Sequence, residues 1–152
     1  MLQPLPTTVR CVSSYEISTD RSRIDLGRVH RFLSTEAYWS PGVSRDVVER
    51  SIEGSICFGV YAPGGQQVGF ARVVTDRATF AWLADVYIEQ GHRGHGLGKR
   101  LVETVLGHPE LTGLRRWFLA TADAHELYRR YGFGELSDIK RFMSRRDPPG
   151  ES

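Results

Sequence analysis

The sequence predicts an α/β domain with a mixed β-sheet. Two helical segments lie among the early strands, and the order strand, helix, strand, helix, strand follows, which is typical of this class. The chain has 152 residues, of which 40% are hydrophobic and 25% charged, as in a soluble domain with a single core. We therefore expect one domain at residues 14–143, after a loose lead-in at 1–13 and before a disordered tail at 144–152.

Composition argues against several classes of function. The net charge is only +2 and the basic residues are scattered, so neither a nucleic acid nor an anionic membrane is expected as a partner. We find neither a secretory leader nor an apolar run of transmembrane length, and we expect a cytoplasmic protein. Cys11 and Cys57 are too few for a disulfide framework, and no His/Cys/Asp group has the spacing of metal ligands.

The first half of the chain is expected to supply one strand and two helices. Residues 15–19 alternate apolar and polar side chains, as in a half-buried strand. Asp20 or Ser22 can accept hydrogen bonds from the first turn of a helix whose apolar face lies at residues 26–33. Ser44 has the same relation to a second helix.

The centre of the chain combines a strand, a glycine-rich turn and a helix. Strands at residues 56–61 and 68–74 flank a Pro/Gly turn, and a further strand ends at Ile88. Residues 93–98 then read Arg-Gly-His-Gly-Leu-Gly, and a helix face begins at about Gly96. Alternate glycines let consecutive N–H groups converge on one anion at the start of the helix. This pattern predicts a diphosphate cradle.

The last third is expected to add a strand, a short helix and a final strand. Residues 117–121 are apolar and aromatic enough for a strand. Thr121 or Asp123 can cap a helix that ends at Gly132 with a glycine cap. Residues 138–143 are expected to form the last strand.

Two segments resemble signatures of the GNAT superfamily of N-acetyltransferases. Arg93-x-x-Gly96-x-Gly98 resembles its coenzyme A pyrophosphate loop, Gln/Arg-x-x-Gly-x-Gly/Ala, and residues 124–133 resemble its later signature, Ala-x-x-Leu-Tyr-x-x-x-Gly-Phe. The resemblance implies a GNAT-type mixed sheet of about six to seven strands, splayed between the fourth and fifth strands and flanked by about four helices. The pantetheine arm of the coenzyme would lie in that split. The resemblance is also compatible with a homodimer.

The activity implied by the resemblance is N-acetyl transfer. Acetyl-CoA would be the donor, and a primary amine of a small molecule or peptide would attack the thioester directly. Two alternatives stay open: a non-catalytic CoA- or acyl-CoA-binding module, and an acyltransferase with a different donor or acceptor. The sequence does not identify the acceptor.

Coenzyme binding is assigned by the resemblance to the central strand, the glycine loop and the later signature. Arg93 or Lys99 would lie near phosphate, or would alternatively be a solvated charge on the first helical turn. Thr121 departs from the family pattern, which often has Asn there. The assigned residues are Val86, Tyr87, Ile88, Arg93, Gly94, His95, Gly96, Leu97, Gly98, Lys99, Thr121, Asp123 and Leu127.

Two side chains are candidates for catalysis. The resemblance assigns Tyr128 to protonate or hydrogen-bond the leaving sulfur, whereas packing as a hydrophobic cap is the alternative. Asp85 is a carboxylate in an apolar strand, which suggests a general base, an acceptor-binding group or a structural carboxylate bonded to backbone. Strand alternation points Asp85 away from the face expected to meet the acceptor, unless a bulge reverses it. Solvated or capping roles are favoured for the weaker candidates Glu16, His30, Glu89 and His125.

Aromatic residues are the sequence's indication of an acceptor site. Tyr38, Trp39 and Trp82 can form a wall that shields an amine or stacks against its carrier. For any single one of them, burial in the core is the favoured interpretation.

Overall fold

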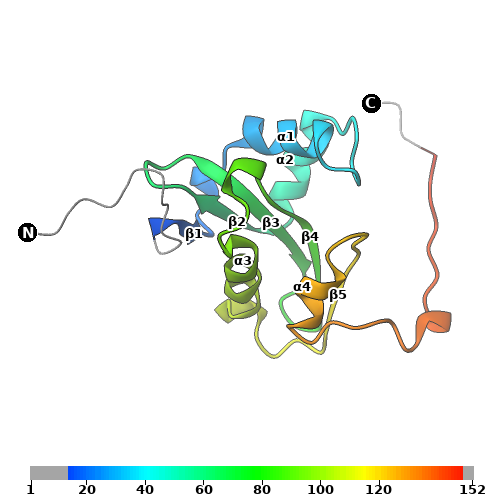
Figure 1. Cartoon of the computed structure of the whole chain (residues 1–152). Helices are drawn as coiled ribbons and strands as arrows, with labels where there is room; N and C mark the ends of the chain where they lie inside the picture. The colour runs from blue at the N-terminus through cyan, green and yellow to red at the C-terminus, as the bar shows by residue number, and fades with distance from the viewer. Residues whose placement is uncertain (1–13, 149–152) are drawn as a thin grey trace, which may run out of the picture. The chain divides into compact units, whose positions relative to one another are not determined.

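The structure, a computed structural model, describes residues 14–148, so the expected lead-in at 1–13 lies outside it. The chain divides between Leu119 and Ala120 into two compact units. The first unit contains the sheet and three helices, and the second contains a short helix and the C-terminal segment (Figure 1).

The first unit is built on a mixed sheet in the order β1-β2-β3-β4-β5. The first four strands pair antiparallel, and β5 pairs parallel with β4. The predicted α/β class with a mixed sheet is confirmed, but the described residues form five strands rather than six to seven. The strands are β1 (Glu16–Ser18), β2 (Ile56–Tyr61), β3 (Gln67–Thr75), β4 (Phe80–Ile88) and β5 (Arg116–Leu119).

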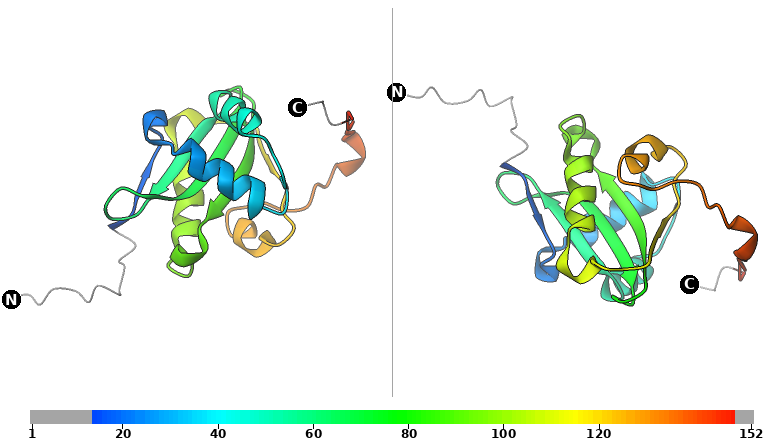
Figure 2. Two further views of the ribbon diagram at one scale, coloured as in Figure 1. Left: turned by 90° about the horizontal axis from the view of Figure 1, so that it is seen from above. Right: turned by 90° about the horizontal axis from the view of Figure 1, so that it is seen from below.

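Helices cover both faces of this sheet. The α-helices are α1 (Leu26–Thr35), α2 (Arg45–Glu53), α3 (Leu97–Leu106) and, in the second unit, α4 (His125–Arg129). In the first unit, α1 and α2 lie on one face and α3 on the other (Figure 2). Beneath α1, Phe32 stacks on Tyr87 of β4 with ring centroids 3.7 Å apart. None of the helices within residues 14–148 is long and apolar enough to cross a membrane.

The start of the first helix differs from the prediction. Asp20 caps only a single 3-10 turn, η2 (Arg21–Arg23), and Ile24 is extended. Asp25 then caps α1 with its side chain, while its own N–H donates to Gln67 Oε1 at 2.8 Å. The chain leaves the 3-10 turn at Ile24, where Asp25 is bonded to β3, and α1 begins only at Leu26. The predicted cap at Ser44 is confirmed, because its side chain accepts from Val47 N.

The predicted last strand is wrong. Residues 138–143 contain a 3-10 turn, η5 (Ile139–Arg141), whose N–H groups reach back three residues. The two large apolar residues Ile139 and Phe142 are three positions apart, which matches the period of a 3-10 turn and not the two-residue alternation of a strand.

Candidate active site

One edge of β4 is left without a strand partner along part of its length. β5 pairs with β4 only from Phe80 to Leu83. Within the part of the chain that the structure describes, residues 84–88 therefore have no strand on that side. The unpaired stretch lies between the fourth and fifth strands, where the family resemblance implies a splayed sheet. Backbone groups along this edge of β4 can pair with a ligand.

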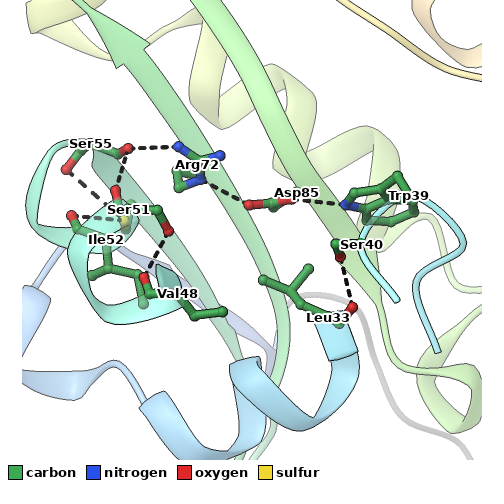
Figure 3. A network of polar contacts seen from close by, with 10 residues as sticks. Leu33, Trp39, Ser40, Val48, Ser51, Ile52, Ser55, Arg72 and Asp85 are labelled. Carbon is green, nitrogen blue, oxygen red and sulfur yellow. Dashed lines mark hydrogen bonds and ion pairs between the residues drawn. The ribbon is translucent and has the colours of Figure 1, made fainter. Parts of the chain in front are cut away.

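A β-bulge lies in the same stretch. Phe70 pairs with Tyr87 and Arg72 with Ala84, so Asp85 and Val86 together oppose Ala71. Asp85 has φ of 53°, which is uncommon for a residue other than glycine. The bulge reverses the alternation of side chains, and Asp85 points to the side of Arg72 and of the α1–α2 connection (Figure 3).

Both carboxylate oxygens of Asp85 are engaged by side chains. Oδ2 accepts from Arg72 Nε at 2.8 Å, and Oδ1 accepts from Trp39 Nε1 at 2.8 Å. The Asp85 side chain is 12% exposed and that of Arg72 18%, so this ion pair is largely shielded from water. The structural alternative expected bonds to backbone, whereas the partners are side chains. Sequence reasoning missed Arg72, although a lone arginine in an apolar strand was a signal.

The far side of Arg72 is anchored on the end of α2. Its Nη1 donates to Ser55 Oγ at 3.1 Å, and Ser55 Oγ donates to the Ser51 carbonyl at 2.7 Å. Arg21 donates to the Ser55 carbonyl at 3.0 Å. Figure 3 shows the result, a chain of polar contacts from α2 through β3 and β4 to Trp39. This network holds the bulge of β4 against the connection between α1 and α2.

The predicted glycine loop is an open backbone turn at the start of α3. Gly94 has φ of 85°, and Gly96, which caps α3, has φ of 76° in the left-handed region. A Cβ at Gly94, Gly96 or Gly98 would meet no described atom within 4 Å. Since glycine has no side chain to cap the helix, the first N–H groups of α3 and its positive dipole end suit an anion.

The base of this loop is tied to the rest of the first unit. Arg93 folds back so that its Nε donates to the Ile88 carbonyl at 2.8 Å. Tyr15 OH lies 2.8 Å from His92 Nδ1. Glu89 forms a two-point ion pair with Arg28 of α1, with both N···O distances 2.6 Å. These contacts fix the direction in which the chain enters the loop.

The other residues of β4 and the glycine loop that were assigned to coenzyme binding differ in exposure. Leu97 and Tyr87 are buried, so their side chains are core and only their backbone is available. His95 and Lys99 are exposed beside the open turn. Val86 and Ile88 lie on the unpaired edge of β4.

The second unit carries the remaining candidates. Neither Thr121 nor Asp123 caps α4 as predicted, because the N-cap is Ala124 and no side chain caps it; Thr121 Oγ1 instead accepts from Ala124 N at 3.0 Å, in the turn before the helix. Tyr128 is buried and packs edge to face on Phe133, with ring centroids 5.8 Å apart. α4 ends at Arg129 with Arg130 as its C-cap, two residues before the predicted end at Tyr131, and the predicted glycine at Gly132 follows with φ of 89°. Leu127 lies within α4, next to Tyr128.

Three of the four weaker candidates have structural partners, and the fourth, His125, is the first residue of α4. Glu16 forms an exposed ion pair with Arg23 at 2.7 Å, and Glu89 is paired as above. His30 Nε2 lies 3.0 Å from the Val43 carbonyl, and His125 begins α4. Within residues 14–148, no group of three His, Cys, Asp or Glu side chains is arranged to hold a metal ion.

Comparison with known proteins identifies the family of this chain. Residues 53–135 match the family model of the acetyltransferase (GNAT) domain. The chain belongs to the GNAT acetyltransferase family. A protein of Gibberella zeae, provisionally named an acetyltransferase, is 31% identical over an alignment of 136 positions, and the match covers 75% of this chain and 75% of that protein.

Solved structures resemble this GNAT chain over most of its length. A protein of Xanthomonas campestris pv. campestris, provisionally assigned as a GNAT acetyltransferase, is 46% identical with a TM-score of 0.85, and the match covers 88% of this chain and 94% of that one. One from Deinococcus radiodurans is 20% identical with a TM-score of 0.70, covering 91% and 92%, and this likeness shows the fold alone.

In this GNAT protein, the three aromatic residues considered for an acceptor site belong to two separate ring pairs. Tyr38 and Trp39, on the connection after α1, meet edge to face at 5.0 Å. Trp82 of β4 stacks with Phe118 of β5 at 6.5 Å. Tyr38, Trp39 and Trp82 are all exposed, so burial in the core is wrong for each of them. Trp39 is the one that reaches Asp85.

Proposed function

We propose that this GNAT protein transfers an acetyl group from acetyl-CoA to a primary amine. The observation that carries the proposal is the open glycine loop, in which Gly94 and Gly96 take positive φ at the uncapped start of α3. Such a turn directs N–H groups at a diphosphate, which is the most highly charged part of a coenzyme A thioester. The family to which the chain belongs supports this choice of ligand.

The chemistry requires few groups. The amine attacks the thioester carbonyl, a C–N bond forms, the C–S bond breaks, and the amine loses one proton to water. Backbone groups on the unpaired edge of β4 at Val86 and Ile88 are the proposed partners of the pantetheine amide and the thioester carbonyl. Tyr128 is the proposed proton donor, since a tyrosine with an ordinary pKa of about 10 carries its proton at neutral pH. Donation to a thiolate, whose conjugate acid has a pKa of about 8.5, is slightly uphill and is completed when water returns a proton to the phenolate.

Calorimetry of acetyl-CoA binding and an assay of thiol release test this proposal. We expect micromolar binding, and release of coenzyme A thiol when the correct class of amine is added. Gly96→Asp places a carboxylate in the loop and should abolish binding by charge repulsion. Gly113→Asp is the matched control, because Gly113 also has φ of 76° and lies in the turn before β5.

The outcomes separate the proposed enzyme from its alternatives. Binding without thiol release for any amine indicates a coenzyme-binding module. Thiol release with another acyl donor or an oxygen acceptor changes the reaction but retains the loop. If the folded protein does not bind acetyl-CoA even at millimolar concentration, the interpretation of the loop is wrong.

A further inference from the structure

Trp39 is an exposed aromatic residue held in place by a largely shielded carboxylate. Trp39 is 43% exposed, and neighbouring Tyr38 is 56% exposed. The indole N–H of Trp39 donates to Asp85 Oδ1 at 2.8 Å, across the space between the α1–α2 connection and β4. The connection is also tied to α1, because Ser40 Oγ donates to the Leu33 carbonyl at 2.7 Å. The orientation of Trp39 is therefore specified by the fold, although solvent covers part of its surface.

Asp85 lies at the point where the proposed reaction would occur. It belongs to the unpaired stretch of β4 at residues 84–88, and its positive φ is a strained conformation. Strain of this kind is retained at sites where function requires it. A carboxylate oxygen can accept more than one hydrogen bond, but each oxygen of Asp85 is already turned to a side chain of the protein, Oδ1 to Trp39 and Oδ2 to Arg72. The geometry therefore fits a group that orients a neighbour better than one that takes a proton.

The charge around Asp85 argues against a polycationic acceptor. Arg72 compensates the carboxylate directly, and Arg21 contributes a second positive charge at Ser55. A polyamine or a lysine-rich peptide carries further ammonium groups that need further carboxylates. Tyr38 and Trp39 instead offer two rings that meet edge to face, an apolar and polarisable surface next to the β4 bulge.

We propose that Asp85 is a positioning residue for Trp39, and that Tyr38 and Trp39 select an acceptor with one amino group on a flat aromatic body. The proposal rests on the proposed acetyl transfer and specifies its substrate class. The rings stack against the body of the acceptor, and its single amine enters beside the unpaired edge of β4. Arylalkylamines belong to this class, whereas polyamines and lysine peptides do not.

An acceptor panel with the full chain and acetyl-CoA tests the substrate class. Phenethylamine and tryptamine are compared with spermidine and a lysine peptide by the rate of thiol release. We expect kcat/KM to be at least about tenfold higher for the two aromatic monoamines, the ratio that one good apolar contact provides. A preference for spermidine or for the peptide overturns the inference while leaving acetyl transfer intact.

Variants test the role of Trp39. Trp39→Ala should raise KM for phenethylamine by about tenfold or more. Trp39→Phe keeps a ring without the N–H and should raise it less. The dissociation constant for acetyl-CoA should stay within about twofold in both variants. Val47→Ala is the matched control, since Val47 on α2 is also 43% exposed, and it should change neither constant.

Asp85→Asn distinguishes positioning from general base catalysis. If Asp85 only orients Trp39, the amide oxygen of the variant can still accept from the indole N–H, so KM for phenethylamine rises less than in Trp39→Ala and kcat stays nearly unchanged across the pH profile. If it is the base, kcat falls by about 100-fold or more for every amine and the profile loses its acid limb. That result, or an unchanged KM in Trp39→Ala, would refute the inference. Should Asp85→Asn fail to fold, Trp39→Phe tests the positioning role by itself, because it removes the N–H that Asp85 accepts and keeps the carboxylate; an unchanged KM for phenethylamine would refute that role. Absence of acetyl-CoA binding, or of turnover with every amine, refutes the proposed function itself.

Discussion

Gly96→Ala should separate coenzyme binding from stability. Gly96 is in the left-handed region, with φ of 76°, and a Cβ there would meet no described atom within 4 Å. An L-residue in this conformation costs about 1–2 kcal/mol, and the smaller entropy of the unfolded chain offsets about 0.4–1 kcal/mol of that. The expected loss in free energy of unfolding is therefore about 1 kcal/mol, or about 2–4 °C in Tm for a chain of this length.

The effect of the same change on binding should be larger. Because no protein atom surrounds the added methyl group, it acts chiefly by displacing a diphosphate from the N–H groups of the loop. A hydrogen bond to a charged oxygen contributes about 1.5–3 kcal/mol, so acetyl-CoA affinity should fall about 10- to 150-fold. Calorimetry measures the dissociation constant, and urea denaturation measures the stability.

Two controls make this prediction refutable. Gly113→Ala carries the same strain at φ of 76° outside the loop, and it should cost similar stability without altering affinity. Gly98 lies within α3 and the family pattern accepts Ala there, so Gly98→Ala should raise stability by about 0.4–1 kcal/mol and retain binding. Equal affinities of Gly96→Ala and Gly113→Ala would show that the diphosphate does not bind at this turn.

Three further predictions concern the first unit. Glu89→Gln should lower the free energy of unfolding by about 1–3 kcal/mol, because it breaks a shielded ion pair with Arg28. Urea denaturation measures this loss, and the double variant with Arg28→Met should lose less than the sum of the two single variants. A loss equal to that sum would contradict the coupling. Burial raises the pKa of the Tyr87 hydroxyl, so its stabilising contribution is complete below the ordinary value of about 10 and is lost as pH rises above it. Tyr87→Phe should therefore lose less stability than the parent protein in urea denaturation at high pH, and an equal loss would argue against it. Burial also raises the pKa of the Cys57 thiol to about 11. In a Cys11→Ser background, iodoacetamide should therefore label Cys57 slowly in the folded protein and quickly in the urea-unfolded protein. Fast labelling of the folded protein would show that the thiol is accessible.

The glycine loop was predictable because its signals are local. Alternate glycines from Gly94 to Gly98 and the apolar face that follows them lie within a few turns of each other, and the structure has α3 beginning at Leu97. The cap of α2 at Ser44 was predictable for the same reason. A helix cap or a positive φ depends on residues a few positions away in the chain, so the sequence alone can indicate it.

The surroundings of Asp85 were not predictable in the same way. Its partners are 13 and 46 positions away in the chain, at Arg72 and Trp39. The sequence indicated that a carboxylate in an apolar strand requires polar partners, but it did not indicate which side chains supply them. The last expected strand at residues 138–143 failed for a related reason, since a strand requires a partner that composition does not specify.

By itself, the sequence determined the α/β order of elements, the turn that suits a diphosphate and the family to which these belong. Only the tertiary structure decided that β4 bulges at Asp85 and that this carboxylate faces Arg72 and Trp39. The physical reason is that side chains alternate along a strand with a period of two, so one extra residue reverses the face of all those that follow. Whether the extra residue occurs depends on the register of the neighbouring strand, which is a property of the folded sheet.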